Sequence, residues 1–116
     1  MTQPLVTVEQ LAQLLAVGAA RAAGQSIDPL PAVRLFTPDA HAIWLLATID
    51  PADGDTAWGL IDLGIGMPAL GTVRLSDLAG IVGPLQRPVL RDLYFQAVRP
   101  LSEYVVLAER DGSISD

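Results

Sequence analysis

Residues 40–49 form the most apolar stretch of the chain and constrain its fold more than any other segment. The stretch is apolar at both odd and even positions, which is typical of a strand buried on both faces of a sheet. It is too short to span a bilayer. Asp50 and Pro51 end it with residues that favour turns. We therefore expect residues 42–50 to be the central strand of a sheet.

Proline and glycine divide the rest of the chain into short segments, several of which have the pattern of strands. Strands are expected at residues 32–37, 42–50, 56–63, 70–75 and 93–98. Strands that follow one another with helices at the ends are typical of an α+β domain built around an antiparallel sheet. With neither a repeat nor a second domain in the pattern, the prediction is one α+β domain, residues 1–116, with a sheet of four to five strands.

Three helices are expected around this sheet. The first spans about residues 8–23, because Thr7 and Gln10 can form a capping box and Gly24 is a natural stop. A short mid-chain helix is expected from Ser76, as its N-cap, to about residue 82. A C-terminal helix is expected at residues 100–108, and residues 111–116 should fray.

The charge balance and the missing residue types exclude several kinds of chemistry. Thirteen acidic residues against seven basic ones give a net charge of −6, which argues against direct nucleic-acid binding. All the basic residues are arginine, so a Schiff-base lysine and a phosphate-loop lysine are excluded. The absence of cysteine excludes disulfides, thiol nucleophiles and thiolate metal sites. Residues 1–6 lack the start of a secretory signal, so a cytoplasmic protein without a membrane anchor is expected.

Short segments in a fixed order carry a resemblance to a known family. They are residues 35–39 (LFTPD), 44–46 (WLL), 50–51 (DP), 58–60 (WGL), 62–68 (DLGIGMP), 70–71 (LG), 75–78 (LSDL) and 91–95 (RDLYF). Over about residues 28–104 the chain resembles a domain-of-unknown-function family of small proteins encoded on conjugative plasmids and other mobile elements of proteobacteria. The resemblance implies a mobile-element context and no particular mechanism.

Three positions depart from the pattern of that family. The family usually has acidic residues where this chain has Thr48, Ala69 and Leu90. If those acidic residues form a site in the family, the resemblance implies that this chain has lost it.

Charged and aromatic residues of the matching segments form a candidate structural or binding cluster, namely Asp39, Asp62, Arg91, Asp92, Trp44 and Trp58. Asp92 precedes the aromatic pair of residues 94–95, which is expected to enter the core on a strand. A buried carboxylate needs a partner, and Arg91, Arg34 and Arg74 are the candidates. Core packing is the default for both tryptophans, and exposure at a partner surface is the alternative.

Other polar groups are better explained without a ligand. His41 is the only histidine, and a zinc site needs three or four ligands. Asp50, Asp53 and Asp55 miss the spacing of a calcium loop and suit a hairpin turn. Gly64 and Gly66 are followed by Pro68 and by a strand-like segment that contains Gly71, which favours a bulge or bend over a phosphate loop.

These observations favour a protein without catalytic, cofactor-binding or metal-binding residues. The leading hypothesis is a small accessory protein of a mobile genetic element that acts by binding another protein, because so few charges leave apolar surface exposed. One alternative is an acidic nucleic-acid mimic that inhibits a host defence or DNA-processing enzyme. Another is a carboxylate-based enzyme around Asp92. A homodimer through the alanine-rich N-terminal helix is also expected.

Overall fold

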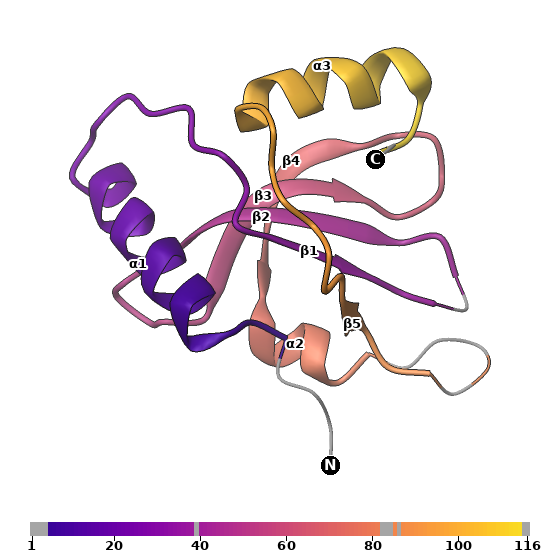
Figure 1. The fold of residues 1–116 in the computed structure, drawn as a ribbon, viewed down its shortest axis with the longest axis horizontal. Helices are drawn as coiled ribbons and strands as arrows, with labels where there is room; N and C mark the ends of the chain where they lie inside the picture. The colour runs from indigo at the N-terminus through magenta and orange to yellow at the C-terminus, as the bar shows by residue number, and fades with distance from the viewer. Residues whose placement is uncertain (1–4, 39, 82–84, 86, 115–116) are drawn as a thin grey trace.

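The computed structural model describes residues 5–38, 40–81, 85 and 87–114. The elements follow the order α1 (Val8–Ala22), β1 (Val33–Phe36), β2 (Ile43–Ile49), β3 (Thr56–Asp62), β4 (Ala69–Arg74), α2 (Leu75–Ala79), β5 (Leu90–Arg91) and α3 (Leu101–Asp111) (Figure 1). Within the described residues, the five strands form one antiparallel sheet in the order β4-β3-β2-β1-β5. The predicted α+β fold is therefore confirmed, with β2 as the central strand.

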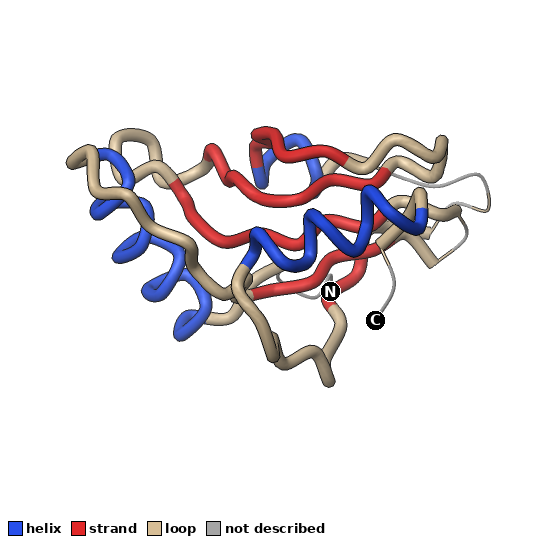
Figure 2. The backbone as a smooth tube through the Cα atoms, turned by 90° about the horizontal axis from the view of Figure 1, so that it is seen from above, coloured by secondary structure: helices blue, strands red, loops and turns tan. Residues whose placement is uncertain are grey.

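Helices cover both faces of the sheet. On the first face, Leu14 of α1 and Leu78 of α2 pack with Leu35, Trp44 and neighbouring residues. On the second face, residues of α3 pack against another cluster of strand residues, Leu45, Ala47 and Leu60. Figures 1 and 2 show α3 lying across one side of the strands, with α2 on the other side. Because β2 contributes to both clusters, its sequence is apolar at every position except Thr48.

An irregularity in β2 changes which residues face each side. The pairing with β3 shifts between Leu46 and Thr48, so one extra residue of β2 is accommodated there. The extra residue brings Ile49 onto the same face as Trp44 and Leu46, although strict alternation would have placed Thr48 there. Sequence alternation alone does not reveal such a bulge.

The start of α1 agrees closely with the prediction. The Thr7 side chain accepts a hydrogen bond from the backbone N–H of Gln10, and the Gln10 side chain accepts one from the N–H of Thr7. Farther along, Gly18 is buried where the helix crosses the end of β2. A Cβ atom on Gly18 would lie 1.8 Å from the carbonyl oxygen of Ile49, so only glycine permits this approach.

Aspartates from distant loops cap the other two helices. The prediction that Ser76 is the N-cap of the mid-chain helix is wrong, because α2 begins directly after β4 at Leu75. Instead Asp55, in the β2–β3 turn, accepts hydrogen bonds from the N–H (3.0 Å) and hydroxyl (2.6 Å) of Ser76. In the same way Asp28 accepts hydrogen bonds from the N–H and hydroxyl of Ser102 at the start of α3. These contacts cross large sequence distances and could not be predicted from local patterns.

The prediction of a strand at residues 93–98 is wrong. The fifth strand is the two-residue β5, which pairs with β1. Directly after it, Oδ1 of Asp92 accepts a hydrogen bond from the N–H of Tyr94 and turns the chain away from the sheet. Leu93 and Tyr94 are consequently exposed, whereas Phe95 and Ala97 pack against the second core cluster.

Substitution of Gly18 by alanine tests the close contact between α1 and β2. Alanine favours a helix by about 1 kcal/mol over glycine, but its Cβ would overlap the Ile49 carbonyl. Overpacking of this kind costs about 1–3 kcal/mol or more. We therefore expect G18A to lower the free energy of unfolding in urea, and A19G, on the exposed side of the helix, to lower it by about 1 kcal/mol. A G18A variant more stable than the parent would contradict the contact.

The β2–β3 turn makes stability depend on acid pH through Asp53. The Thr56 hydroxyl and the N–H groups of Thr56 and Asp55 donate hydrogen bonds to Asp53, and they lower its pKa from 3.8 to about 2. The resulting stabilisation is present above pH 4 and is lost as the pH falls through about 2. The melting temperatures of the parent and D53N should therefore differ most above pH 4 and converge near pH 2. T56V, which removes the largest cause, should show part of the same effect; a difference that does not change with pH would contradict this account.

Candidate functional site

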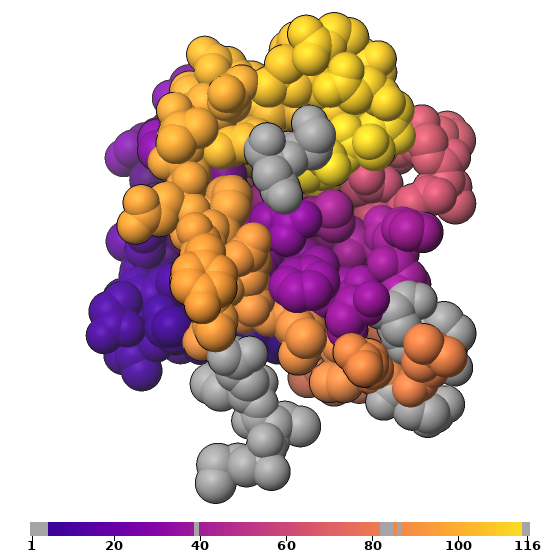
Figure 3. Space-filling model, turned by 45° about the vertical axis from the view of Figure 1, so that its right-hand side comes forward, coloured from indigo at the N-terminus to yellow at the C-terminus, as the bar shows by residue number. Residues whose placement is uncertain are grey.

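The second face of the sheet carries an open cleft over β1 and β2. Two adjoining cavities of about 450 and 370 Å³ share Arg34 and Ile114 as lining residues. We name the combined space the Arg34 cleft. Figure 3 shows the hollow with side chains of β1 and β2 between the segment that precedes α3 and α3 itself. The larger cavity is also lined by Phe36, Thr37, Ala40, His41, Ala42, Ile43, Asp62, Gly64, Gly66, Gly112 and Ser113, and the smaller by Leu45, Asp92, Tyr94, Phe95, Gln96, Val98 and Tyr104.

Strand register explains why these side chains share one face. Asp62, Ile43, Phe36 and Leu90 are successive partners across β3, β2, β1 and β5, so they lie in one row. Arg34 lies two residues from Phe36 along β1 and therefore points to the same side. The Arg34 guanidinium lies over the Phe36 ring, 5.5 Å from the ring centroid. The cleft thus combines an arginine, an aromatic ring and a carboxylate.

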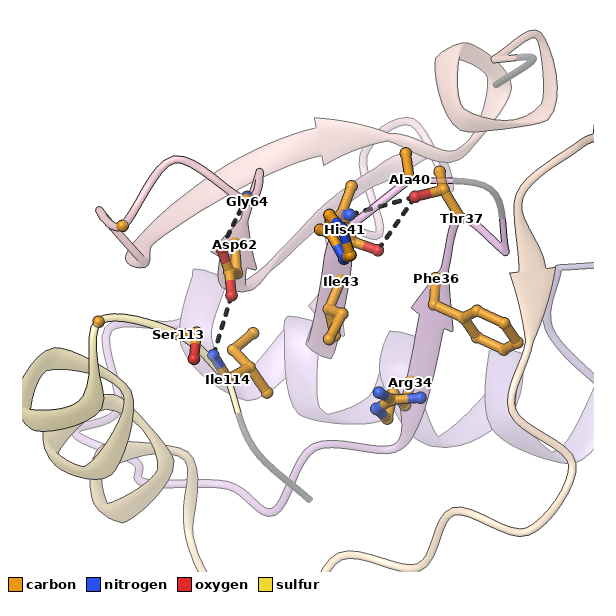
Figure 4. A pocket seen from close by; sticks show the side chains of 13 residues that line it. Arg34, Phe36, Thr37, Ala40, His41, Ile43, Asp62, Gly64, Ser113 and Ile114 are labelled. Carbon is orange, nitrogen blue, oxygen red and sulfur yellow. Dashed lines mark hydrogen bonds between the residues drawn. The ribbon is translucent and has the colours of Figure 1, made fainter. Parts of the chain in front are cut away.

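Asp62 is a buried carboxylate at the end of β3 whose two oxygens both accept backbone hydrogen bonds. Oδ1 accepts the N–H of Gly64 at 2.8 Å, and Oδ2 accepts the N–H of Ile114 at 2.9 Å (Figure 4). Gly64 has a φ of +80°, and a Cβ there would lie 2.9 Å from Cβ of His41. Asp62 therefore holds the turn after β3 and the segment after α3 together at one end of the cleft.

Arg34 and Asp92 form an ion pair at the other end. Nη1 of Arg34 lies 3.2 Å from Oδ2 of Asp92, and the two side chains are 14% and 24% exposed. The backbone N–H of Asp92 also donates to the carbonyl of Arg34 at 2.9 Å. Among the three arginines considered from the sequence, the structure therefore pairs Arg34 with Asp92. This pair fixes the segment that forms one wall of the cleft.

The predicted cluster is not brought together as a whole. Asp62 and Asp92 line the cleft, whereas Trp44 lies in the core on the opposite face. Arg91 pairs with Leu35, whose side chain belongs to that opposite face as well. Asp39 lies outside the described residues.

Trp58 is only partly buried, which corrects the expectation of a core residue. It packs against the second cluster without being buried in it. The guanidinium of Arg21 lies 4.3 Å from the centre of the ring. Trp58 therefore contributes to the attachment of α1 and not to the cleft.

Two groups of site residues were missed from the sequence. Alternation along β1 was a usable signal, since burial of Val33 and Leu35 places Arg34 and Phe36 on the other face. Ile114 gave no signal, because it follows the last helix and was expected to fray. It is in fact 8% exposed and packs with the second core cluster.

The three positions at which the resemblance led us to expect acidic residues are far apart. Ala69 lies on β4 and Leu90 on β5, at opposite edges of the sheet. Four strand spacings of about 4.8 Å separate them, or roughly 19 Å. Thr48 is buried opposite Trp58 near the far end of β2. Carboxylates at these positions would not form one site in this fold.

The titratable side chains around the Arg34 cleft include two carboxylates and His41. Both carboxylates that line it already accept hydrogen bonds, and His41 is exposed at the rim without a carboxylate bonded to it among the described contacts. Among the residues that the structure describes, no three histidine, aspartate or glutamate side chains gather to hold a metal ion. Of the helices in the described ranges, none has the length and apolarity needed to cross a bilayer.

Comparison with known proteins assigns the chain to a family. The family model described as protein of unknown function DUF2958 matches residues 5–115. The chain belongs to the DUF2958 family. The match is wider than the predicted core of residues 28–104 and includes both α1 and Ile114. No curated protein and no solved structure matches the chain.

Substitution of Asp92 by asparagine tests the ion pair that fixes the wall of the cleft in this DUF2958 protein. Exposed pairs contribute about 0–1 kcal/mol, and loss of one partner of a buried pair costs about 3–5 kcal/mol. The pair with Arg34 is mostly but not fully buried, so D92N should lower the free energy of unfolding by about 1–3 kcal/mol.

The exposed pair of Arg110 and Asp111, 3.0 Å apart, supplies a matched control. D111N should change the free energy of unfolding by less than about 0.5 kcal/mol. Equal effects of D92N and D111N in urea titrations would contradict the structural role assigned to Asp92.

Proposed function

We propose that this protein is a non-catalytic interaction module that binds another protein over the Arg34 cleft. The supporting observation is a group of exposed apolar side chains at the edge of this cleft. Leu63, Ile65 and Met67 are 58%, 71% and 74% exposed, and they alternate with Gly64 and Gly66, which line the cleft. We name these three side chains the apolar rim.

The other end of the cleft is bordered in a similar way. Tyr94 is 91% exposed and lines the smaller cavity together with Val98, which is also exposed. Apolar side chains exposed singly are normal on a protein surface, but a contiguous group beside a cleft is typical of an interaction site. Tyrosine and arginine are also the residue types that often dominate binding energy at interfaces.

The acidic-mimic alternative receives less support from the arrangement of carboxylates. Mimicry of a nucleic acid requires carboxylates exposed in a row at phosphate-like spacing. Asp50, Asp53 and Asp55 are close in sequence, but each accepts hydrogen bonds from its own turn or from the start of α2. The carboxylate-enzyme alternative is weakened because Asp62 and Asp92 are both engaged in holding the fold.

The context expected from the sequence belongs to the same proposal. We place the module in the cytoplasm as an accessory protein of a mobile genetic element, on the resemblance alone. Self-association through α1 stays a prediction: Ala12, Ala16 and Ala19 lie exposed on its outer side, while Leu14 and Gly18 face the sheet.

Affinity purification from the native host, followed by reconstitution, tests the proposed surface. The tagged parent should capture a protein that I65S/M67S loses, because the double variant removes apolar contact area from the rim. V8S/V106S removes exposed valines away from the cleft and should retain the partner. With the purified partner, we expect the rim variant to bind at least about ten times more weakly, which corresponds to about 1.4 kcal/mol.

Equal binding by the rim and control variants would overturn the proposed surface. The absence of any captured protein would overturn the proposed function. Melting temperatures of both double variants should stay near that of the parent, since substitutions at exposed positions change stability by about 0.5 kcal/mol or less.

A further inference from the structure

Residues 112–114, directly after α3, line the Arg34 cleft. Gly112 ends the helix with a φ of +76°, in the left-handed region that glycine adopts easily, and the chain turns back over the sheet. Ile114 then lines both cavities. Its side chain is buried in the cluster that contains Leu45, Leu60 and Tyr104.

Ile114 is held by the two kinds of contact that a bound peptide makes. Its backbone N–H donates to the buried Oδ2 of Asp62, and its aliphatic side chain fills an apolar position beside the strands. Recognition of extended segments commonly combines main-chain hydrogen bonds for affinity with side-chain pockets for specificity. Figure 4 shows the backbone of Ile114 joined to the Asp62 carboxylate by this hydrogen bond.

The hydrogen bond from Ile114 to Asp62 is one that the backbone N–H of another segment can replace. Oδ1 serves the local turn through Gly64, two residues away, whereas Oδ2 serves a residue 52 positions away in the sequence. Loss of Ile114 would leave the turn intact and expose a buried acceptor that needs a new donor. A partner segment with a free backbone N–H would supply that donor.

We propose that the Arg34 cleft binds an extended segment of the partner protein, with an aliphatic side chain in the place of Ile114 and a backbone N–H on Asp62. This inference rests on the proposed function and adds the chemistry of the occupant. Residues 112–114 then act as an internal competitor that must leave before the partner segment enters. A tethered segment competes at an effective concentration in the millimolar range, so it weakens the apparent affinity of any external segment.

Peptide binding to the full chain tests the inference with a defined probe. The probe is an acetylated and amidated peptide with the sequence of residues 110–114, Arg-Asp-Gly-Ser-Ile. I114A weakens the internal competitor, so it should bind the peptide at least about ten times more tightly than the parent in an NMR titration. V106A, which shortens an exposed side chain of α3, should bind the peptide as the parent does.

Three further measurements show where the peptide binds. A peptide with serine in place of isoleucine should lose binding to I114A, and D62N/I114A should bind the original peptide more weakly than I114A. In the parent, millimolar peptide should shift the backbone N–H resonances of Ile114 and Gly64, which both donate to Asp62. This last measurement needs no substitution and therefore does not depend on the folding of any variant.

The inference is overturned if I114A does not bind the peptide at millimolar concentration, or if I114A and the parent bind it equally. Partner capture that is lost in I65S/M67S, together with no peptide binding to I114A, would uphold the proposed function and reject the occupant proposed here. Peptide binding to I114A without any captured protein would reject the proposed function and uphold the chemistry of the cleft.

Discussion

Burial of β2 on both faces is the constraint on which the rest of the structure depends. Its residues contribute to the cluster under α1 and α2 and to the cluster under α3. Because of the bulge between Leu46 and Thr48, Ile49 lies on the face that α1 covers. The strand β2 therefore contributes residues to both clusters. Gly18 then allows α1 to rest directly on the backbone at that end of the strand. The position of the first helix, and hence the choice of face left for the cleft, follows from these contacts.

Aspartates connect segments that are distant in the sequence. Asp28 and Asp55 cap helices α3 and α2, Asp62 binds the backbone at Ile114, and Asp92 binds Arg34. In each case a carboxylate accepts a hydrogen bond from a donor that the local backbone does not supply. A chain with a net charge of −6 thus uses several of its acids as internal acceptors and not as an exposed array. This use of acidic residues favours a binding module over an acidic mimic.

The floor of the Arg34 cleft consists of strands, whereas its walls consist mostly of loop segments. β1 and β2 form the floor, whereas residues 92–99, the turn after β3 and the segment after α3 form the walls. Functional sites often lie on loops that a rigid scaffold positions. In this protein Asp62 and Asp92 attach those walls to the sheet. The same two carboxylates that stabilise the fold therefore shape the surface at which we propose the partner binds.

The sequence alone determined the α+β class, the central position of residues 42–50 and the start of α1, because apolar periodicity and capping chemistry act over short distances. It also indicated Asp62 and Asp92 as structural carboxylates and included Arg34 among the possible partners. Only the tertiary structure decided that Arg34 is that partner, that Ile49 replaces Thr48 in the core, and that residues 93–98 leave the sheet. It also decided that Ile114 lies in the cleft. The pairing of Arg34 with Asp92 and the position of Ile114 depend on contacts between segments far apart in the chain, such as the 52 positions between Asp62 and Ile114. Local patterns carry no information on such pairs, since the geometry that brings them together exists only after the sheet and its helices have packed.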